Sequence, residues 1–244
     1  MYFDDESWAV RYIIVDTGKW LPGRLVLISA MAVTQPDRVS RQLNVALTRE
    51  QVRNSPAIDT EQPVSRQQER LHLRYYGYPY YWVGPALWGA STLPAVATPP
   101  VPVEAAGATD SDSAESHLRS CREVAGYHLR GTDGELGHAD DFLVDDSDWA
   151  IRYLVVDTSN WWVGRKVLIA PEWVDSIDWL ERSVHVDVTR ATVEQAPRYD
   201  AAAHVTRQWE ADYYAHHKRP PYWMSTEPAR KIKTRRLRPP VITK

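Results

Sequence analysis

The strongest constraint on the fold of this chain is an internal repeat. When the sequence is shifted by 141 positions, residues 4–82 align with residues 145–223 without a gap, and 31 of the 79 aligned positions are identical. The identical pairs include Trp8 with Trp149 and the Tyr-Trp dipeptide that closes each copy. Chance does not produce identity of this extent, so we expect two copies of one small domain.

The sequence between and after the copies has a different composition. A Thr-Pro-Pro-Val-Pro run followed by Ala, Gly, Asp and Ser predicts a linker over residues 83–117, because such a segment buries little apolar surface. We therefore expect repeat 1 at residues 1–82, repeat 2 at residues 118–223 and a basic tail at residues 224–244.

Charge is distributed unevenly along the chain. The whole chain carries −3, which divides into −9 for residues 1–223 and +6 for residues 224–244. Such a tail could contact phosphate groups or anionic lipid, although a solvated tail is the simpler interpretation. The candidate contacts are Arg230, Lys231, Lys233, Arg235, Arg236 and Arg238.

The more complete second copy indicates mostly strands. An Asp-Gly pair between residues 126–132 and 135–144 predicts a hairpin with a tight turn. Residues 149–157 are almost continuously apolar, as in a strand buried on both faces. A further strand is expected over 166–169, and the alternation of valines with polar residues over 181–188 predicts a half-buried strand.

Two helices are expected at the end of each copy. Thr189 can cap a short helix that Pro197 ends, and Thr48 begins the equivalent helix with a capping box to Gln51. Thr206 can cap a longer helix whose aromatic residues lie on one face. The predicted fold class is mainly β, with two tandem small barrels of about six meander strands, each followed by short helices.

The first copy begins late, because Met1 aligns with Phe142. The opening hairpin of repeat 1 is therefore missing, and a barrel without two strands exposes unpaired backbone edges. Three explanations are open: the assigned start is an internal methionine, the linker covers the edge, or a strand from a partner completes it. The first explanation is the one we favour.

Several of these segments resemble the PRC-barrel family, named for the cytoplasmic domain of the photosynthetic reaction centre H subunit. The resemblance rests on Gly-Tyr and Thr-Asp-Gly-Glu-Leu-Gly-His over 126–138, on Asp-Phe at 141–142 and on the Trp-to-Thr run over 149–158. The Tyr- and Trp-rich ends at 79–82 and 221–223 are also similar to stand-alone bacterial members. The resemblance covers both copies, or about four-fifths of the chain, except for the missing hairpin.

The resemblance implies a small β-barrel fold and a role in binding other macromolecules, without catalysis by the barrel itself. In the H subunit such a barrel lies on a membrane complex, and in a ribosome maturation factor it helps to bind the small subunit. Fold-level analogy does not fix the function of this chain.

No recognised catalytic or metal-binding pattern occurs. The carboxylates of Asp4 and of residues 145–148 lack an EF-hand pattern and are better explained as turn caps. His138, His216 and His217 do not supply three or four converging ligands for zinc. Arginine and acidic positions retained in both copies predict ion pairs between strand ends and the helix, among them Arg11/Arg152, Arg24/Arg165, Arg66/Arg207 and Glu69/Glu210. We expect no enzyme activity, catalytic residue, cofactor or metal.

The aromatic ends of both copies are the most promising surface. They either pack back on the barrel or form a contact between the copies or with another chain, since Tyr and Trp dominate binding hot spots. The candidate interaction residues are Tyr75, Tyr76, Tyr80, Tyr81, Trp82, Tyr213, Tyr214, Tyr222 and Trp223.

These features together predict a cytoplasmic adaptor or scaffold that binds another macromolecule, most simply a protein. The single cysteine, Cys121, fits a reducing compartment, and no signal peptide or membrane-spanning run is evident. Homo-oligomerisation is open. The first alternative is a module peripheral to the inner face of a membrane, resembling the H-subunit domain. The second is an RNA or ribosome-maturation factor, which the acidic body of the chain disfavours because nucleic-acid binders usually carry a basic face.

Overall fold

The computed structural model divides the chain into two compact units. Unit 1 comprises Met1–Cys121 with Val144–Ile151, and unit 2 comprises Arg122–Leu143 with Arg152–Lys244. The residues that the structure describes are 1–18, 20–21, 24–34, 37, 39–56, 64–94, 117–159, 165–224 and, for the backbone alone, 233–235. The Pro-rich part of the predicted linker and most of the predicted basic tail lie outside these residues.

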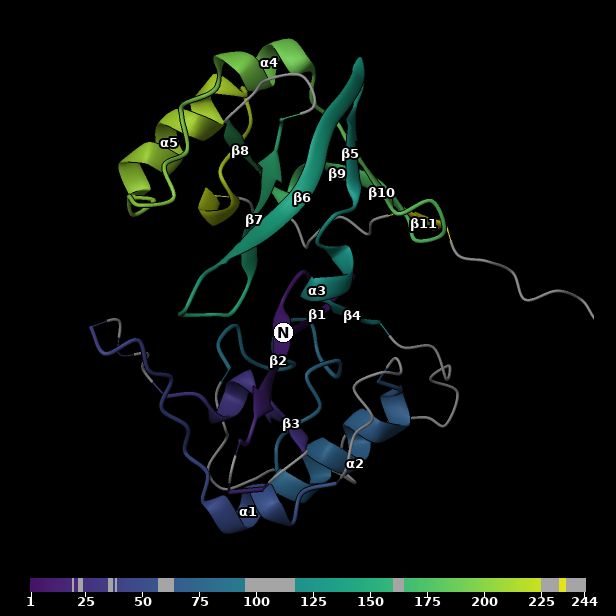
Figure 1. Ribbon diagram of the computed structural model, residues 1–244, viewed down its shortest axis with the longest axis vertical. Coiled ribbons are helices and arrows are strands. Elements are labelled where there is room, and N and C mark those ends of the chain that lie inside the picture. The colour runs from purple at the N-terminus through teal and green to yellow at the C-terminus, as the bar shows by residue number, and fades with distance from the viewer. Residues whose placement is uncertain are drawn as a thin grey trace, which may run out of the picture. The chain divides into compact units, whose positions relative to one another are not determined.

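Strand residues outnumber helical residues, so the protein is β-rich as predicted. The strands are β1 (Tyr2–Asp4), β2 (Val10–Asp16), β3 (Leu25–Ser29), β4 (Leu118–Ser120), β5 (His128–Gly131), β6 (Gly134–Val144), β7 (Ile151–Asp157), β8 (Lys166–Ile169), β9 (Val174–Asp178), β10 (Ser183–Val186) and β11 (Lys233–Arg235). The α-helices are α1 (Arg49–Arg53), α2 (Arg66–Tyr76), α3 (Cys121–Val124), α4 (Arg190–Gln195) and α5 (Arg207–His216) (Figure 1). Short 3-10 helices span Ala30–Ala32, Pro171–Trp173 and Tyr222–Met224.

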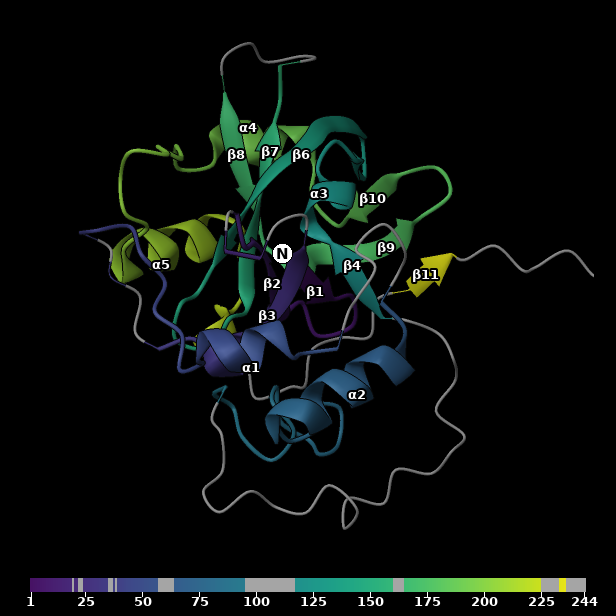
Figure 2. The same ribbon diagram turned by 60° about the horizontal axis from the view of Figure 1, so that its bottom comes forward.

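Unit 1 contains a four-stranded sheet in the order β3-β2-β1-β4. Strand β4 pairs antiparallel with β1, and Tyr2 lies opposite Ser120. The edge of β1 is therefore covered by residues that directly follow the predicted linker. The side of the unit next to β3 carries α1 and α2 in both views (Figures 1 and 2).

One turn of the second repeat belongs to unit 1. Residues Val144–Ile151 group with this unit, and Ala150 forms an antiparallel bridge with its repeat counterpart Ala9. Residues 84–91 of the predicted linker also fold onto unit 1, where Trp88 is buried. Burial of a tryptophan side chain is favourable in free energy compared with its exposure to water. The ordered part of unit 1 therefore extends beyond residue 82.

Unit 2 contains a seven-stranded sheet in the order β11-β9-β10-β5-β6-β7-β8. The predicted Asp-Gly hairpin is confirmed, since β5 and β6 pair antiparallel with Gly131 opposite Gly134. The order departs from a pure meander, because the hairpin of β9 and β10 returns to place β10 parallel to β5. In the described part of the chain, the order ends at β8 and β11, and neither sheet closes on itself.

Strand β6 approaches β7 so closely that one position requires glycine. Gly137 has φ of +128°, and a Cβ added there would lie 2.0 Å from the carbonyl oxygen of Asp157. The Leu-Gly-His step in the sequence therefore has a steric role.

The predicted helix starts are confirmed in both copies. Thr48 and Ser65 each form a capping box, with Gln51 and Gln68 respectively. Thr206 accepts a hydrogen bond from the backbone of Trp209 at the start of α5. Each cap satisfies backbone N–H groups that have no partner inside the helix.

The acidic turns satisfy their own backbone, as the sequence indicates. The Asp4 carboxylate accepts hydrogen bonds from the N–H and the hydroxyl of Ser7, both at 2.8 Å. Asp145, its repeat counterpart, accepts hydrogen bonds from the N–H and the hydroxyl of Ser147, at 3.0 and 2.6 Å. Among the described residues, no group of three or more His, Cys, Asp or Glu side chains is arranged to hold a metal ion.

Candidate functional site

The nine candidate aromatic residues divide between core and surface. Tyr81, Tyr213 and Tyr214 are buried, at 3%, 1% and 1% exposure. Tyr75 and Trp223 are exposed, at 40% and 37%. The half-buried ones are Tyr76, Tyr80, Trp82 and Tyr222. The buried ones pack on their own unit, as one of the two sequence interpretations expects.

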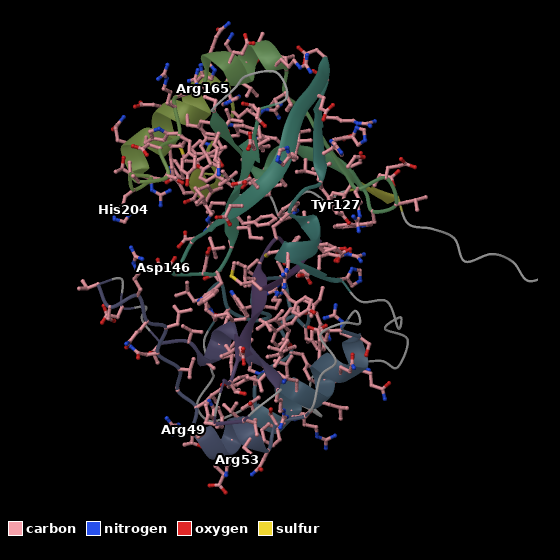
Figure 3. All side chains as sticks on the ribbon, viewed as in Figure 1. Arg49, Arg53, Tyr127, Asp146, Arg165 and His204 are labelled. Carbon is pink, nitrogen blue, oxygen red and sulfur yellow. The ribbon has the colours of Figure 1, made fainter. Side chains whose placement is uncertain are left out.

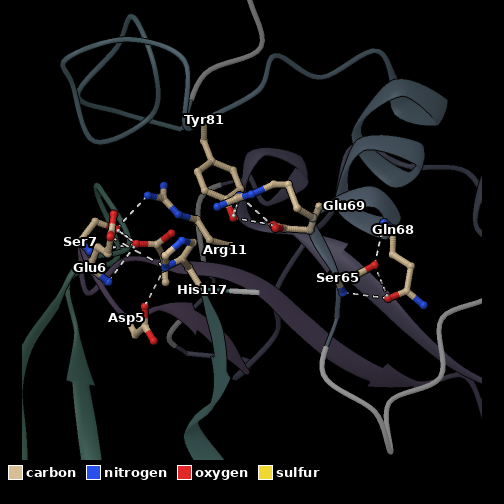
Figure 4. A network of polar contacts seen from close by, with 11 residues as sticks. Asp5, Glu6, Ser7, Arg11, Ser65, Gln68, Glu69, Tyr81 and His117 are labelled. Atoms are coloured by element: carbon tan, nitrogen blue, oxygen red, sulfur yellow. Dashed lines mark hydrogen bonds and ion pairs between the residues drawn. The ribbon is translucent and has the colours of Figure 1, made fainter. Parts of the chain in front are cut away.

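In unit 1, the end of the aromatic segment meets the start of α2 in a buried polar cluster. Arg66 Nη1 lies 3.0 Å from both Glu69 Oε2 and the hydroxyl of Tyr81. The same hydroxyl donates to Glu69 Oε1 (Figure 4). The guanidinium of Arg66 also lies 4.2 Å above the ring of Trp82. Arginine, glutamate, tyrosine and tryptophan thus form one cluster, which we call cluster 1.

Burial sets the ionisation of cluster 1. It raises the pKa of Glu69 to about 7, although the charge of Arg66 and the hydrogen bond from Tyr81 oppose this. Burial, together with the nearby Glu69 carboxyl, also raises the pKa of Tyr81 well above its usual value. Removal of both groups from water disfavours their charged forms.

A second arginine links cluster 1 to residues that follow Trp82. The guanidinium of Arg11 lies between two rings, 3.9 Å from Tyr81 and 4.6 Å from Trp88. It donates hydrogen bonds to the carbonyl of Leu87 at 2.8 Å and to the hydroxyl of Ser7 at 2.9 Å. Trp88 covers this arginine and is itself only 2% exposed.

The same arrangement recurs in unit 2 at the repeat-related positions, and we call it cluster 2. Arg207 lies 3.0 Å from Glu210 and donates to the Tyr222 hydroxyl at 2.9 Å. Its guanidinium is 4.2 Å from the ring of Trp223. Arg152, the counterpart of Arg11, lies 4.0 Å from the ring of Tyr222.

The two clusters differ in exposure. The Arg66 side chain is 9% exposed, whereas that of Arg207 is 59% exposed. Arg11 is buried and Arg152 is half-buried. The repeat-related counterparts of residues 84–91 are residues 225–232, which lie outside the described residues. Among the described residues of cluster 2, Arg207 and Trp223 lie at the surface.

Arg66 pairs with Glu69, and Arg207 pairs with Glu210. Each pair lies within one helix turn and connects to an aromatic side chain, so these pairs do not join a strand end to the helix as predicted. Arg24 instead donates hydrogen bonds to the backbone, to the carbonyl of Arg53 at 2.6 Å and to that of Ser55. The sequence analysis missed Trp88, although its position within an apolar Pro-Ala-Leu-Trp run inside a polar linker was a usable signal.

A second polar network lies near the start of unit 1. Asp5 is buried and accepts a hydrogen bond from Arg119 Nε at 2.9 Å, and its other oxygen lies 3.3 Å from His117 Nδ1 (Figure 4). The bond to Asp5 raises the pKa of His117. These contacts attach the segment around β4 to β1, so the network has a structural role.

Arg49 and Arg53 are exposed on α1 (Figure 3). Of the predicted tail contacts, Lys233 and Arg235 lie in β11, which pairs parallel with β9 through their backbone. Arg230, Lys231, Arg236 and Arg238 lie outside the described residues. None of the described helices has the length and the apolar character to cross a membrane.

No protein-family model matches the chain, and no curated protein matches it significantly. The resemblance to the PRC-barrel family stays a prediction that rests on the sequence segments named above.

Proposed function

We propose that the protein is a non-enzymatic adaptor or scaffold that binds another macromolecule through cluster 2. The observation that carries the proposal is the contrast in exposure between Arg66 and Arg207, at 9% and 59% of the side chain. The two arginines hold the same partners, but only the second can reach a ligand. Arginine, tyrosine and tryptophan are the side chains enriched at binding hot spots.

The chemistry of cluster 2 favours a protein partner. The ring of Trp223 is held by Arg207, so little side-chain entropy remains to be lost on binding. In unit 1 the arginine equivalent to Arg152 is Arg11, which is covered by the ring of Trp88 and by the backbone carbonyl of Leu87. We expect the partner to offer the same two groups.

We propose further that both units are PRC-type barrels and that the chain acts in the cytoplasm. The β-rich fold, the confirmed Asp-Gly hairpin and the sequence segments quoted above support the first part. The single cysteine supports the second. A location peripheral to a membrane and a role in RNA or ribosome maturation are the competing functions.

The decisive experiment is affinity capture from native lysate with four forms of the chain: wild type, Trp223→Ala, Trp82→Ala and residues 1–223. Trp82 is the matched control, because it holds the equivalent position in cluster 1. A protein retained by wild type, by Trp82→Ala and by the truncated chain, but lost with Trp223→Ala, supports the proposal. Retention that depends only on residues 224–244, with RNA or anionic vesicles as the ligand, overturns it.

A further inference from the structure

Asp5 is a buried carboxylate of unit 1, and the segment around β4 supplies its basic partners. The residue is 1% exposed, whereas its repeat counterpart Asp146 is exposed. Arg119 Nε donates to one carboxylate oxygen at 2.9 Å, and His117 Nδ1 lies 3.3 Å from the other (Figure 4). A carboxylate that is removed from water is stable only while charged or hydrogen-bonding groups face it. The ionised Asp5 side chain and the attached β4 therefore stabilise each other.

Among the described residues, β4 is the three-residue strand at one end of the unit 1 sheet. The strand pairs with Tyr2–Asp4 over its whole length. Beyond the strand, the N–H of Cys121 donates to the carbonyl of Met1 at 3.0 Å, and the N–H of Asp5 donates to the carbonyl of His117 at 2.8 Å. A short terminal strand can open locally while the rest of its domain stays folded. Cys121, the only cysteine of the chain, is 8% exposed and would reach solvent when β4 opens.

His117 faces acidic groups in the turn that follows β1. Its Nδ1 lies 3.8 Å from Glu6 Oε1, in addition to the contact with Asp5, and Arg119 of β4 shares the Asp5 carboxylate. The hydrogen bond to Asp5, with the charges of Glu6 and Asp4, raises the pKa of His117 above 6.5, although partial burial opposes the change. The attached strand therefore holds the proton more tightly than the detached strand. This contribution is complete below pH 6.5 and is lost as pH rises through the raised pKa.

We propose that His117 is a pH-sensitive latch that holds β4 on β1 while its ring is protonated and favours release of β4 when the proton is lost. The imidazolium bridges Asp5 and Glu6. When the pH rises, the proton passes to solvent, and Asp5 retains the Arg119 guanidinium. The equilibrium then shifts towards a form in which the edge of β1 and the Cys121 thiol are accessible. Because an uncovered strand edge is a template for pairing with another strand, the latch controls access to the unit 1 sheet.

The test measures how fast Ellman's reagent labels Cys121 in the full chain at about pH 6 and at about pH 8.5. Each rate is divided by the rate for the urea-unfolded chain at the same pH, because the thiolate fraction then cancels. Proportionality of the rate to the reagent concentration shows that opening is at equilibrium. The corrected rate of the wild type should rise about three-fold or more between the two pH values.

Three variants assign this pH dependence. His117→Asn cannot take up the proton and should give the same corrected rate at both pH values. Glu6→Gln should reduce the ratio of the two rates, because it removes a charge that favours the protonated ring; the Glu6 side chain is 58% exposed. His128→Asn is the matched control and should keep the wild-type ratio, because His128 also lies 3.0 Å from a carboxylate, that of Glu135, but belongs to unit 2.

A corrected wild-type rate that does not change with pH overturns the proposal. So does a pH dependence that persists in His117→Asn, because another group then controls the opening. If His117→Asn does not fold, an unchanged ratio in Glu6→Gln overturns the proposal instead. The measurement needs no partner of cluster 2, so failure of the latch and failure of the proposed function are distinguishable.

Discussion

Trp8 and Trp149 occupy equivalent positions in the two repeats and share one unusual backbone conformation, with φ of +55° and +61°. The carbonyl of Trp149 accepts a hydrogen bond from the N–H of Val10 at 2.8 Å, and the carbonyl of Trp8 accepts one from the N–H of Ile151 at 2.7 Å. Val10 and Ile151 are equivalent as well, so the contact is reciprocal, as in an isologous interface. The duplicated turn therefore contacts its own duplicate within unit 1.

A second equivalent pair with positive φ leads to a stability prediction. Arg41 and Arg182 have φ of +54° and +49°, and both side chains are exposed. For a residue with a Cβ this conformation costs about 1–2 kcal/mol, whereas glycine adds about 0.4–1 kcal/mol of entropy to the unfolded chain. Arg182→Gly should therefore raise the free energy of unfolding slightly, as measured by urea denaturation. Glu181→Gly is the control and should lower it; a similar loss for both variants would contradict the argument.

Replacement of the buried Trp88 should cost more stability than replacement of Trp223, which lies at the surface of cluster 2. Trp88 is 2% exposed and its indole N–H donates to the carbonyl of Asp148 at 2.8 Å. Trp88→Ala should lower the stability of unit 1 by about 3–5 kcal/mol, the usual range for a buried tryptophan. Trp223→Ala should cost less than about 1 kcal/mol, since surface substitutions usually have small effects. Thermal unfolding of both variants measures the difference, and equal losses would show that cluster 2 is buried.

Local signals in the sequence predicted local structure well. The Asp-Gly hairpin, the capped helices at Thr48, Thr189 and Thr206 and the self-satisfied acidic turns depend on neighbouring residues, and all are found. The parallel pairing of β5 with β10 was not predicted, because it joins segments more than 50 residues apart. Nothing in the alternation of one strand specifies its partner.

The candidate site was predicted only in part. The repeat identified Arg66, Glu69 and their counterparts, and the aromatic ends supplied Tyr81 and Tyr222. The sequence could not show which copy is covered, because the cover is Trp88, which lies outside the repeated segment. Exposure of a side chain depends on tertiary contacts that composition does not encode.

The buried carboxyl of Glu69 predicts a stability that falls as pH rises. Its folded pKa of about 7 lies above the usual value of 4.5, so the folded state retains a proton that the unfolded state loses. This contribution is fully present below pH 4.5 and is lost as pH rises through 7, with a slope of up to about 1.4 kcal/mol per pH unit. Glu69→Gln should remove that slope in urea denaturation between pH 4.5 and 7. An unchanged slope in the variant would assign the dependence to another group.

His72 should act in the opposite direction. It is 1% exposed, and neither ring nitrogen has a hydrogen-bond partner among the described residues. Burial lowers its pKa from 6.5 to about 4, so the folded state holds it neutral while the unfolded state takes up a proton. The neutral ring therefore contributes fully to the free energy of unfolding above pH 6.5. This contribution falls by up to about 3 kcal/mol as the pH falls towards 4, because the unfolded state binds one more proton than the folded state.

His72→Leu, which keeps the volume and removes the titration, should therefore be more stable relative to wild type at pH 4.5 than at pH 7.5. His217 is a second test, because burial lowers its pKa to about 4 as well and neither ring nitrogen has a hydrogen-bond partner among the described residues. Urea denaturation of wild type, each single variant and the Glu69→Gln His72→Leu pair separates the two opposing slopes. A single variant that retains the wild-type pH profile would show that the replaced group does not control the pH dependence of stability.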